Sequence, residues 1–157
     1  AGVMLLIQQP DQWNLLKSDP KRYLPVLVEE ILRLEGPVQG LFREAAEDIK
    51  FHGVDIPKGS VINVRYAAAN LDDAMFETPQ KLNLERENSR QHLAFGFGTH
   101  FCLGASLARL EIKLFFEQLI ERVENFTLAG NPVEMPNAFV YGLASCPMDL
   151  TPKASHV

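Results

Sequence analysis

The sequence lacks several features that would identify a disulfide-rich, nucleic-acid-binding or membrane protein. Its 157 residues include only two cysteines, Cys102 and Cys146, which excludes a disulfide-stapled scaffold and favours a reducing compartment. Acidic residues outnumber basic ones by 20 to 15, so the net charge of -5 gives no overall attraction to nucleic acid or to an anionic membrane. The opening stretch, AGVMLLIQQP, lacks a basic leader, and its apolar run is too short to span a bilayer. We therefore expect a cytoplasmic protein that contacts neither nucleic acid nor membrane.

Apolar residues make up 46% of the chain, which is enough for the core of one ordinary domain. The chain begins without Met and already inside a helix-like pattern, so we expect it to be a piece of something longer. Helices are expected near both ends with a small sheet between them and no β-α-β alternation. This predicts an α+β fold, mainly helical with small antiparallel β hairpins, in which residues 1–157 form a single partial domain.

Periodic apolar spacing predicts helices over residues 2–9, 10–20, 23–34 and 102–123. In the third of these, Pro25 is expected in the first turn, where proline is tolerated. The last helix has the strongest pattern, because it contains no proline and its leucines follow roughly one stripe: Leu107, Leu110, Leu114 and Leu119.

Between these helices the sequence changes character. Residues 38–66 alternate, are rich in β-branched side chains and carry turn signals, which predicts two or three short strands. A short helix is expected over 67–73. The segment 73–92 is polar, irregular and long for a connection, so either a function or specific contacts must order it. From Phe126 onward we expect short strands joined by turns.

The stretch LAFGFGTHFCLGASLARLEIK, residues 93–113, combines glycines, aromatic side chains, a histidine and a cysteine. A dinucleotide fingerprint fails because Phe101 stands where its third glycine belongs, and no lysine for a phosphate loop occurs before Lys113. Zinc would use His100 and Cys102, but their spacing is poor and no second ligand pair is near. A nucleophilic Cys102 at the start of a helix is physically better, because the helix dipole favours a thiolate there, but no Asp or Asn partner is identifiable.

A thiolate bound to haem would account for each part of this stretch. Haem iron accepts a cysteine thiolate as its proximal ligand. Gly96 and Gly98 would let the loop fold under the macrocycle, and Gly104 would let the start of the helix approach it. Phe95 would shield the sulfur from water, and His100 could donate to a propionate.

The stretch FGFGTHFCLG resembles the haem-binding signature of the cytochromes P-450, F-x-x-G-x-[HR]-x-C-x-G, at every fixed position. The resemblance implies a haem b with Cys102 as axial iron ligand and the C-terminal portion of the P-450 fold, of the bacterial soluble type. It also implies an arginine partner for a haem propionate, at Arg43. Relatives line the substrate pocket at positions that correspond to Val38, Leu41, Phe139 and Val140, although core packing explains these four equally well.

A second match lies in the expected helix over 23–34. Glu30 and Arg33 form the family's E-x-x-R pattern, which on its own is most often a weak surface pair. Here the helix is apolar, and an unpaired buried charge would be expensive. The resemblance implies that Arg86, from the irregular segment, completes a network with these two residues.

The resemblance covers nearly the whole chain, but the chain matches less than half of a full-length member. The acid-threonine pair that relays protons to oxygen has no counterpart, and Thr99 lies in the wrong loop to replace it. Two functions stay open. One is the C-terminal part of a monooxygenase that oxidises an apolar small molecule with electrons from a ferredoxin- or flavodoxin-type partner, docked with help from Arg109 and Lys113. The other is a truncated, non-catalytic haem-binding or interaction module, completed by a missing N-terminal half or by self-association.

Overall fold

The structure, a computed structural model, describes residues 1–135, 137 and 140–154. Its helical elements are α1 (Gly2–Gln8), α2 (Pro10–Ser18), α3 (Pro20–Glu35), α4 (Tyr66–Ala69), the 3-10 turns η1 (Ser89–Gln91) and η2 (Gly98–His100), and α5 (Ala105–Arg122). Its strands are β1 (Leu41–Glu44), β2 (Ile49–Phe51), β3 (Val54–Ile56), β4 (Val61–Val64), β5 (Val123–Leu128), β6 (Val133–Glu134), β7 (Leu143–Ser145) and β8 (Met148–Pro152).

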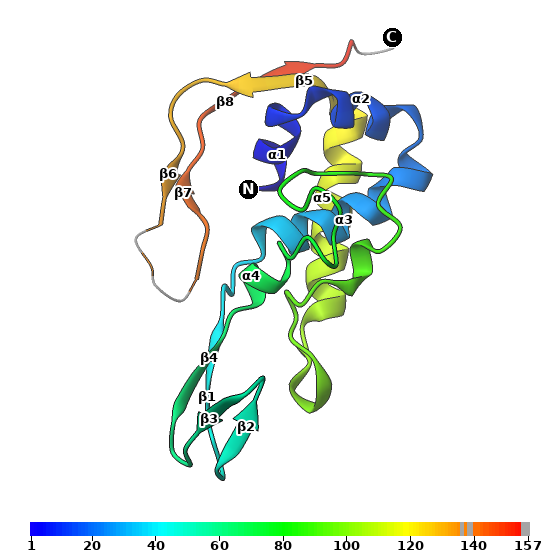
Figure 1. Cartoon of the computed structure of the whole chain (residues 1–157). Helices are drawn as coiled ribbons and strands as arrows, with labels where there is room; N and C mark the ends of the chain where they lie inside the picture. The colour runs from blue at the N-terminus through cyan, green and yellow to red at the C-terminus, as the bar shows by residue number, and fades with distance from the viewer. Residues whose placement is uncertain (136, 138–139, 155–157) are drawn as a thin grey trace.

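Helix α3 runs through the centre of the helical body (Figure 1). The carboxylate of Asp19 accepts a hydrogen bond from the backbone N–H of Arg22 at 3.2 Å, and Pro20 occupies the first helical position, where no N–H is needed. These signals start the helix before the predicted residue 23. Pro25 therefore lies in its second turn and not, as expected, in its first.

The core lies where α1, α2, α3 and α5 meet the irregular segment that follows α4. Its most deeply buried apolar residues come from four parts of the chain, namely Leu6, Leu16, Leu27, Phe76, Leu82 and Leu84. Trp13 ties α2 to the C-terminal strands, because its indole N–H donates to the Glu124 carbonyl at 3.0 Å and its ring contacts Phe126. The irregular segment is thus ordered by burial of its leucines as well as by polar contacts.

Strands β1 to β4 extend away from the helical body at the lower end of the molecule (Figure 1). β1 pairs antiparallel with β4, and β2 pairs antiparallel with β3. His52 and Gly53 make the β2–β3 turn with φ values of 46° and 83°, as a tight hairpin requires. The region holds four strands and not the expected two or three, because two short pairs form in place of one longer hairpin.

The C-terminal residues return along the helical body as strands. β5 pairs antiparallel with β8, and β6 with β7. A single antiparallel bridge joins Val38, just after α3, to Val140. This bridge holds the C-terminal segment beside the start of the β1–β4 region.

Helix α5 begins at Ala105, capped by Gly104, and not at Cys102 as predicted. Cys102 belongs to the preceding turn, where its carbonyl accepts from the Ala105 N–H at 3.3 Å. Three of the four leucines in the predicted stripe are exposed: Leu107, Leu110 and Leu114 are 60%, 49% and 49% exposed, whereas Leu119 is half-buried and packs against the core. Helix α5 buries Phe116 and Ile120, because α3 packs on that side and no described element covers the three exposed leucines. None of the described helices has the length and apolar character needed to cross a membrane.

Candidate haem-thiolate site

A cavity of about 590 Å³ opens beside Cys102, which is within the usual size range of small-molecule sites. Three segments that are far apart in sequence form it: the stretch from the end of α3 into β1, the start of α4, and the glycine loop, residues 93–104. Its lining residues are Val38, Leu41, Arg43, Tyr66, Ala94, Phe95, Gly96, Phe97, His100 and Cys102. The structure therefore gathers at one cavity most of the residues that the sequence singled out for haem.

The glycine loop owes its shape to backbone conformation. Gly96 and Gly98 have φ values of 71° and 78°, in the left-handed region that side chains with a Cβ disfavour. The backbone N–H of Cys102 donates to the Phe95 carbonyl at 3.0 Å and closes the loop on itself. An added Cβ at Gly98 would meet no atom within 4 Å, so the chain's own packing does not require glycine there.

Gly104 differs from the other two glycines. Its φ is -82°, which any residue adopts, and an added Cβ would touch only the Cys102 sulfur at 3.9 Å. Neither strain nor crowding within the chain requires glycine at this position. Like Gly98, it lies in the loop without lining the cavity.

Two basic side chains lie at the cavity. Arg43 stands on β1 and is exposed, with one guanidinium nitrogen donating to the Phe42 carbonyl at 2.8 Å. His100 lies in η2 and is also exposed. Together they can offer positive or hydrogen-bonding groups to an anionic ligand at the edge of an otherwise apolar wall.

The predicted substrate-lining residues divide into three groups. Val38 and Leu41 line the cavity. Val140 is held near it through its bridge to Val38, but it is not among the lining residues. Phe139 lies outside the described residues.

These residues fit a haem chemically. Cys102 carries an exposed free thiol into the cavity, Phe95, Phe97 and Leu41 supply apolar surface, and the side chains of Arg43 and His100 offer donors that carboxylates could accept. Among residues that the structure describes, no third His, Cys, Asp or Glu joins His100 and Cys102 in a cluster that could hold a metal ion. A single exposed thiolate donor on an apolar wall suits a planar cofactor that brings its own four nitrogen ligands.

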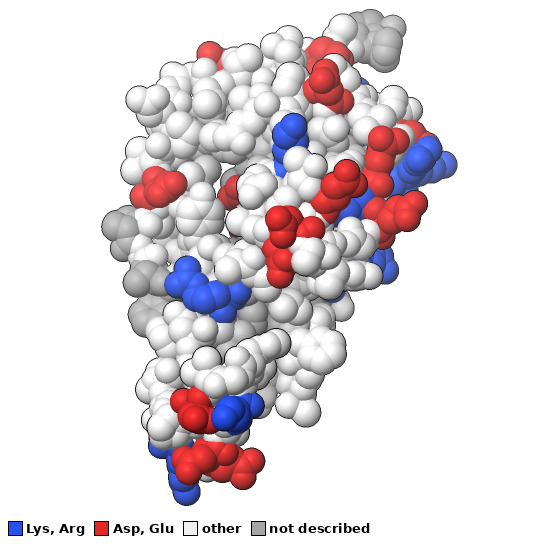
Figure 2. All heavy atoms as spheres, viewed as in Figure 1, with Lys and Arg blue, Asp and Glu red and all other residues white. Residues whose placement is uncertain are grey.

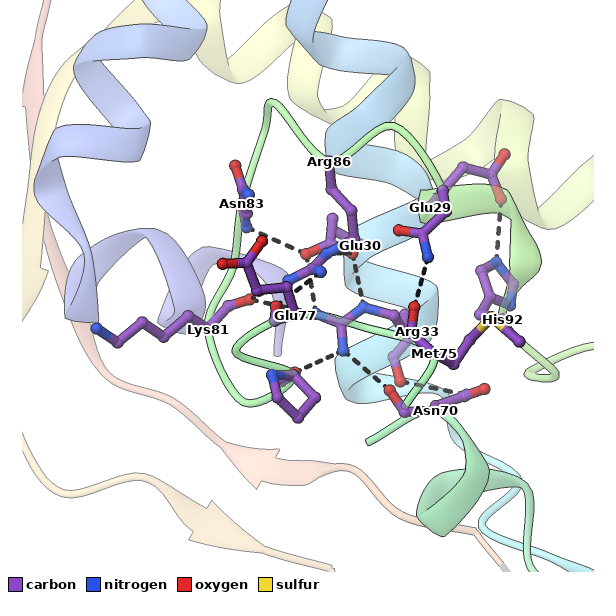
Figure 3. Close-up of polar contacts among 12 residues, drawn as sticks. Glu29, Glu30, Arg33, Asn70, Met75, Glu77, Lys81, Asn83, Arg86 and His92 are labelled. Carbon is purple, nitrogen blue, oxygen red and sulfur yellow. Dashed lines mark hydrogen bonds and ion pairs between the residues drawn. The ribbon is translucent and has the colours of Figure 1, made fainter. Parts of the chain in front are cut away.

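Glu30 on α3 is the centre of a buried ionic network (Figure 3). Arg33 donates to both of its oxygens, from Nε at 2.6 Å and from Nη2 at 2.9 Å. The Nε of Arg86 lies 3.0 Å from Glu30 Oε1, in an ion pair without hydrogen-bond geometry. The backbone N–H of Asn83 donates to the other oxygen at 3.1 Å. The carboxylate and both guanidinium groups are almost completely buried, so this is no surface pair.

The same two arginines hold the irregular segment in place. Arg33 Nη1 donates to the carbonyls of Asn70 and Pro79, at 2.9 and 2.5 Å. Arg86 Nη1 donates to the Glu77 carbonyl at 2.9 Å. The ring of Phe76 lies under both guanidinium groups, with centroid distances of 5.0 and 5.8 Å. The long connection after α4 is thus fixed by backbone carbonyls that accept from buried cations.

A second buried carboxylate, Glu29, was missed by the sequence analysis. It accepts from Arg109 on α5 in a bidentate pair, at 2.9 and 3.0 Å, and lies 3.0 Å from His92 Nε2. Burial alone would raise the pKa of Glu29, but the hydrogen bonds from His92 and Arg109 outweigh it and lower that pKa to about 2. The signal available in the sequence was the Glu29-Glu30 pair inside an apolar helix, of which only the second member belongs to a recognised pattern.

The residues expected to dock a redox partner have partners within the chain. Arg109 is bound to Glu29 and only a third exposed, and Lys113 pairs with Glu117 one turn further along α5 at 2.6 Å. On the face drawn in Figure 2, acidic and basic side chains stand together at the lower end, and large areas carry no charge. A docking role for Arg109 must compete with its contact to Glu29.

Comparison with known proteins finds a matching protein family and several similar proteins. The family model described as "Cytochrome P450" matches residues 8–149. A steroid C26-monooxygenase from Mycobacterium tuberculosis (strain CDC 1551 / Oshkosh) is 41% identical over 155 residues, which are 97% of this chain and 41% of that protein. Cytochrome P450-terp from a Pseudomonas species is 38% identical over 96% of this chain and 35% of its own length.

Solved structures agree with the sequence comparisons. P450BioI, crystallised with an acyl carrier protein ligated to hexadec-9Z-enoic acid, superposes with a TM-score of 0.90 at 35% identity, over 96% of this chain and 39% of the other. CYP108D1 from Novosphingobium aromaticivorans DSM12444 has a TM-score of 0.86 at 40% identity, over 94% and 36%. This chain thus spans about two fifths of the length of these relatives. Since the family model covers most of its residues, the chain belongs to the cytochrome P450 family.

Proposed function

We propose that Cys102 is the axial thiolate ligand of a haem iron and that this chain forms the proximal side of that haem's site. The observation that carries the proposal is an exposed thiol on an otherwise mainly apolar cavity with Arg43 and His100 at its edge. When bound, haem supplies redox chemistry toward dioxygen, and the thiolate donates electron density to the iron. Residues 1–157 are then part of one domain.

The chain's own residues have distinct roles in this proposal. Phe95 lines the same cavity as Cys102 and would limit the contact of the sulfur with water once haem is bound. Gly96 and Gly98 give the loop the left-handed turns that present Cys102, and Gly104 leaves room beside the sulfur. Arg43 and His100 bind the haem carboxylates. The network of Glu30, Arg33 and Arg86 keeps the segment that leads into this loop fixed.

The test is a titration of the chain with haem, followed by an absorption spectrum of the reduced protein under carbon monoxide. Wild type should bind one haem and show the red-shifted Soret band of thiolate ligation. Cys102→Ala should lose that band, whereas Cys146→Ala, which removes the other free thiol, should keep it. If Cys102→Ala keeps the band, or wild type takes up no haem, the proposal is wrong.

For the whole protein we propose a monooxygenase that inserts one oxygen atom into an apolar small molecule, using electrons from a ferredoxin- or flavodoxin-type partner in the cytoplasm. Similar proteins support the substrate class, since they include a steroid C26-monooxygenase, P450BioI in complex with a fatty-acylated carrier protein, and CYP109E1 from Bacillus megaterium in complex with corticosterone. Val38 and Leu41 line the cavity and would contact such a substrate, and Phe139 and Val140 are further candidates.

A second function is favoured by the exposed leucines of α5, which no described element covers. In that case this chain alone is a non-catalytic haem-binding or interaction module that associates with a missing N-terminal half or with itself. Turnover with an electron donor and an apolar test substrate decides between the two. Oxygenated product supports the enzyme, and peroxide without product supports the module.

A further inference from the structure

Glu29 connects three elements through one buried carboxylate. It lies on α3, accepts a bidentate pair from Arg109 on α5, and contacts His92 just before the glycine loop. Arg90 in η1 approaches the same carboxylate at 3.8 Å but is largely exposed. The glycine loop begins one residue after His92 and ends five residues before Arg109. A single side chain of α3 therefore holds the chain on both sides of this loop.

The His92 ring transmits this contact into the loop. Its Nδ1 accepts from the backbone N–H of Ala94 at 3.1 Å, so the ring proton is on Nε2 and donates to Glu29. The adjoining backbone N–H of Leu93 donates to Asn70 Oδ1 at 2.6 Å. The first residues of the loop are thus fixed by side chains from α3 and from the end of α4.

Arg109 transmits the contact from the other side. Its guanidinium lies over the Phe95 ring, 4.7 Å from the centroid, while its Nε and Nη2 donate to Glu29. The carbonyl of Phe95 accepts from the backbone N–H of Cys102 at 3.0 Å. A continuous path of contacts runs from Glu29 through Arg109 and Phe95 to the backbone of Cys102.

The neighbouring carboxylate of Glu30 contacts a different segment of the chain from Glu29. Adjacent residues on a helix point about 100° apart, so the two glutamates face different parts of the molecule. Among the described residues, the hydrogen-bond and ion-pair partners of the Glu30 carboxylate lie on α3 itself or in the irregular segment, and none lies in the glycine loop. The two carboxylates therefore order two successive segments.

We propose that Glu29 is a positioning residue for the glycine loop, which acts through His92 and Arg109 to fix the backbone that presents Cys102. The inference rests on the proposed function only for the identity of what Cys102 binds. The low pKa of Glu29, about 2, keeps its carboxylate ionised near neutral pH.

Amide hydrogen exchange of the chain tests the inference without haem. Glu29→Gln and His92→Ala should speed exchange in residues 93–104 by about tenfold or more, the effect of losing one charge-assisted hydrogen bond on local opening. The control Glu117→Gln removes an exposed carboxylate from α5 and should leave this loop unchanged. Equal protection of the loop in wild type and in both variants overturns the proposal.

If Glu29→Gln loses amide-exchange protection throughout the chain, substitutions of Arg109 provide the second test. The Arg109 side chain is a third exposed, and in Arg109→Ala the buried Glu29 carboxylate keeps His92 as a partner at 3.0 Å. Arg109→Ala should speed exchange in the loop alone, and Arg109→Lys, which keeps the charge, should restore part of the protection. No loop-specific change in Arg109→Ala overturns the proposal.

The haem-loaded protein supplies a second readout. In Glu29→Gln the reduced carbon monoxide spectrum should show a smaller thiolate-ligated fraction than wild type, measured under conditions in which both proteins are folded. Loop exchange that responds while wild type takes up no haem would leave this inference standing and remove the proposed function. Normal haem spectra together with unchanged loop exchange in the variants would overturn this inference and leave the proposed function standing.

Discussion

Glu30 shows how the protein accepts ionic groups in its interior. Its carboxylate is fully buried, yet each oxygen has a guanidinium or backbone partner, and the guanidinium groups donate in turn to backbone carbonyls. Desolvation of the three charges is offset only while every partner is present. Removing one member leaves an unpaired buried charge, which is the costliest outcome.

Glu30→Gln should therefore lower the free energy of unfolding by about 3–5 kcal/mol, because two buried arginines lose their counter-charge. Urea denaturation measures this change. Glu117→Gln, whose partner Lys113 is exposed, should cost no more than about 1 kcal/mol and serves as the matched control. Equal losses in the two variants would contradict the account of the network.

The low pKa of Glu29 predicts how the free energy of unfolding changes at acidic pH. Its pKa is about 2 in the folded protein against an ordinary value of 4.5, so the ionised form contributes stability above pH 4.5 that is lost as pH falls toward 2. The contribution is at most about 3 kcal/mol. Between these pH values the free energy of unfolding should fall more steeply for wild type than for Glu29→Gln, measured by urea titrations at each pH. Parallel slopes would show that Glu29 is not held ionised.

The sequence predicts only part of these contacts, for a physical reason. Arg86 could be assigned to Glu30 because a known pattern supplied the pairing across more than fifty residues. Glu29 and its partners His92 and Arg109 are 63 and 80 residues apart. No periodicity or local spacing encodes such a contact, which exists only once α3 and α5 pack together.

Helix α5 shows the same limit at the scale of an element. Apolar periodicity identified the helix and most of its length, but it cannot tell which of two apolar faces will be covered. Packing by α3 selects the face with Phe116, and the leucine face stays outside. The clearance for a ligand expected at Gly96 and Gly98 of the preceding loop stays a prediction, and their left-handed backbone angles are a second reason for glycine there.

Two adjacent phenylalanines on α5 test which face is buried. Phe116 is 3% exposed and Phe115 is 53% exposed. Phe116→Ala should lower the free energy of unfolding by about 3–5 kcal/mol because it leaves a cavity in the core. Phe115→Ala should cost less than about 1 kcal/mol, since most surface substitutions lie within that range. Urea denaturation of both variants gives the comparison, and a larger loss for Phe115→Ala would reverse the assignment of the faces.

At the scale of the whole molecule, the uncovered leucine face accompanies a chain that spans about two fifths of its relatives' length. Exposed apolar surface of this kind favours association. Sedimentation velocity should show concentration-dependent association of wild type, and the double substitution Leu110→Lys with Leu114→Lys should reduce it without loss of helical signal. A wild-type chain that stays monomeric at every concentration would contradict this expectation.

The central claim is that Cys102 carries the sulfur that binds haem iron. X-ray absorption at the iron edge of the haem-loaded chain measures this directly, because sulfur and nitrogen ligands scatter differently. Wild type and Cys146→Ala should each show one sulfur ligand, and Cys102→Ala should show none. A wild-type spectrum with nitrogen ligands alone, as His100 would give, would contradict the account.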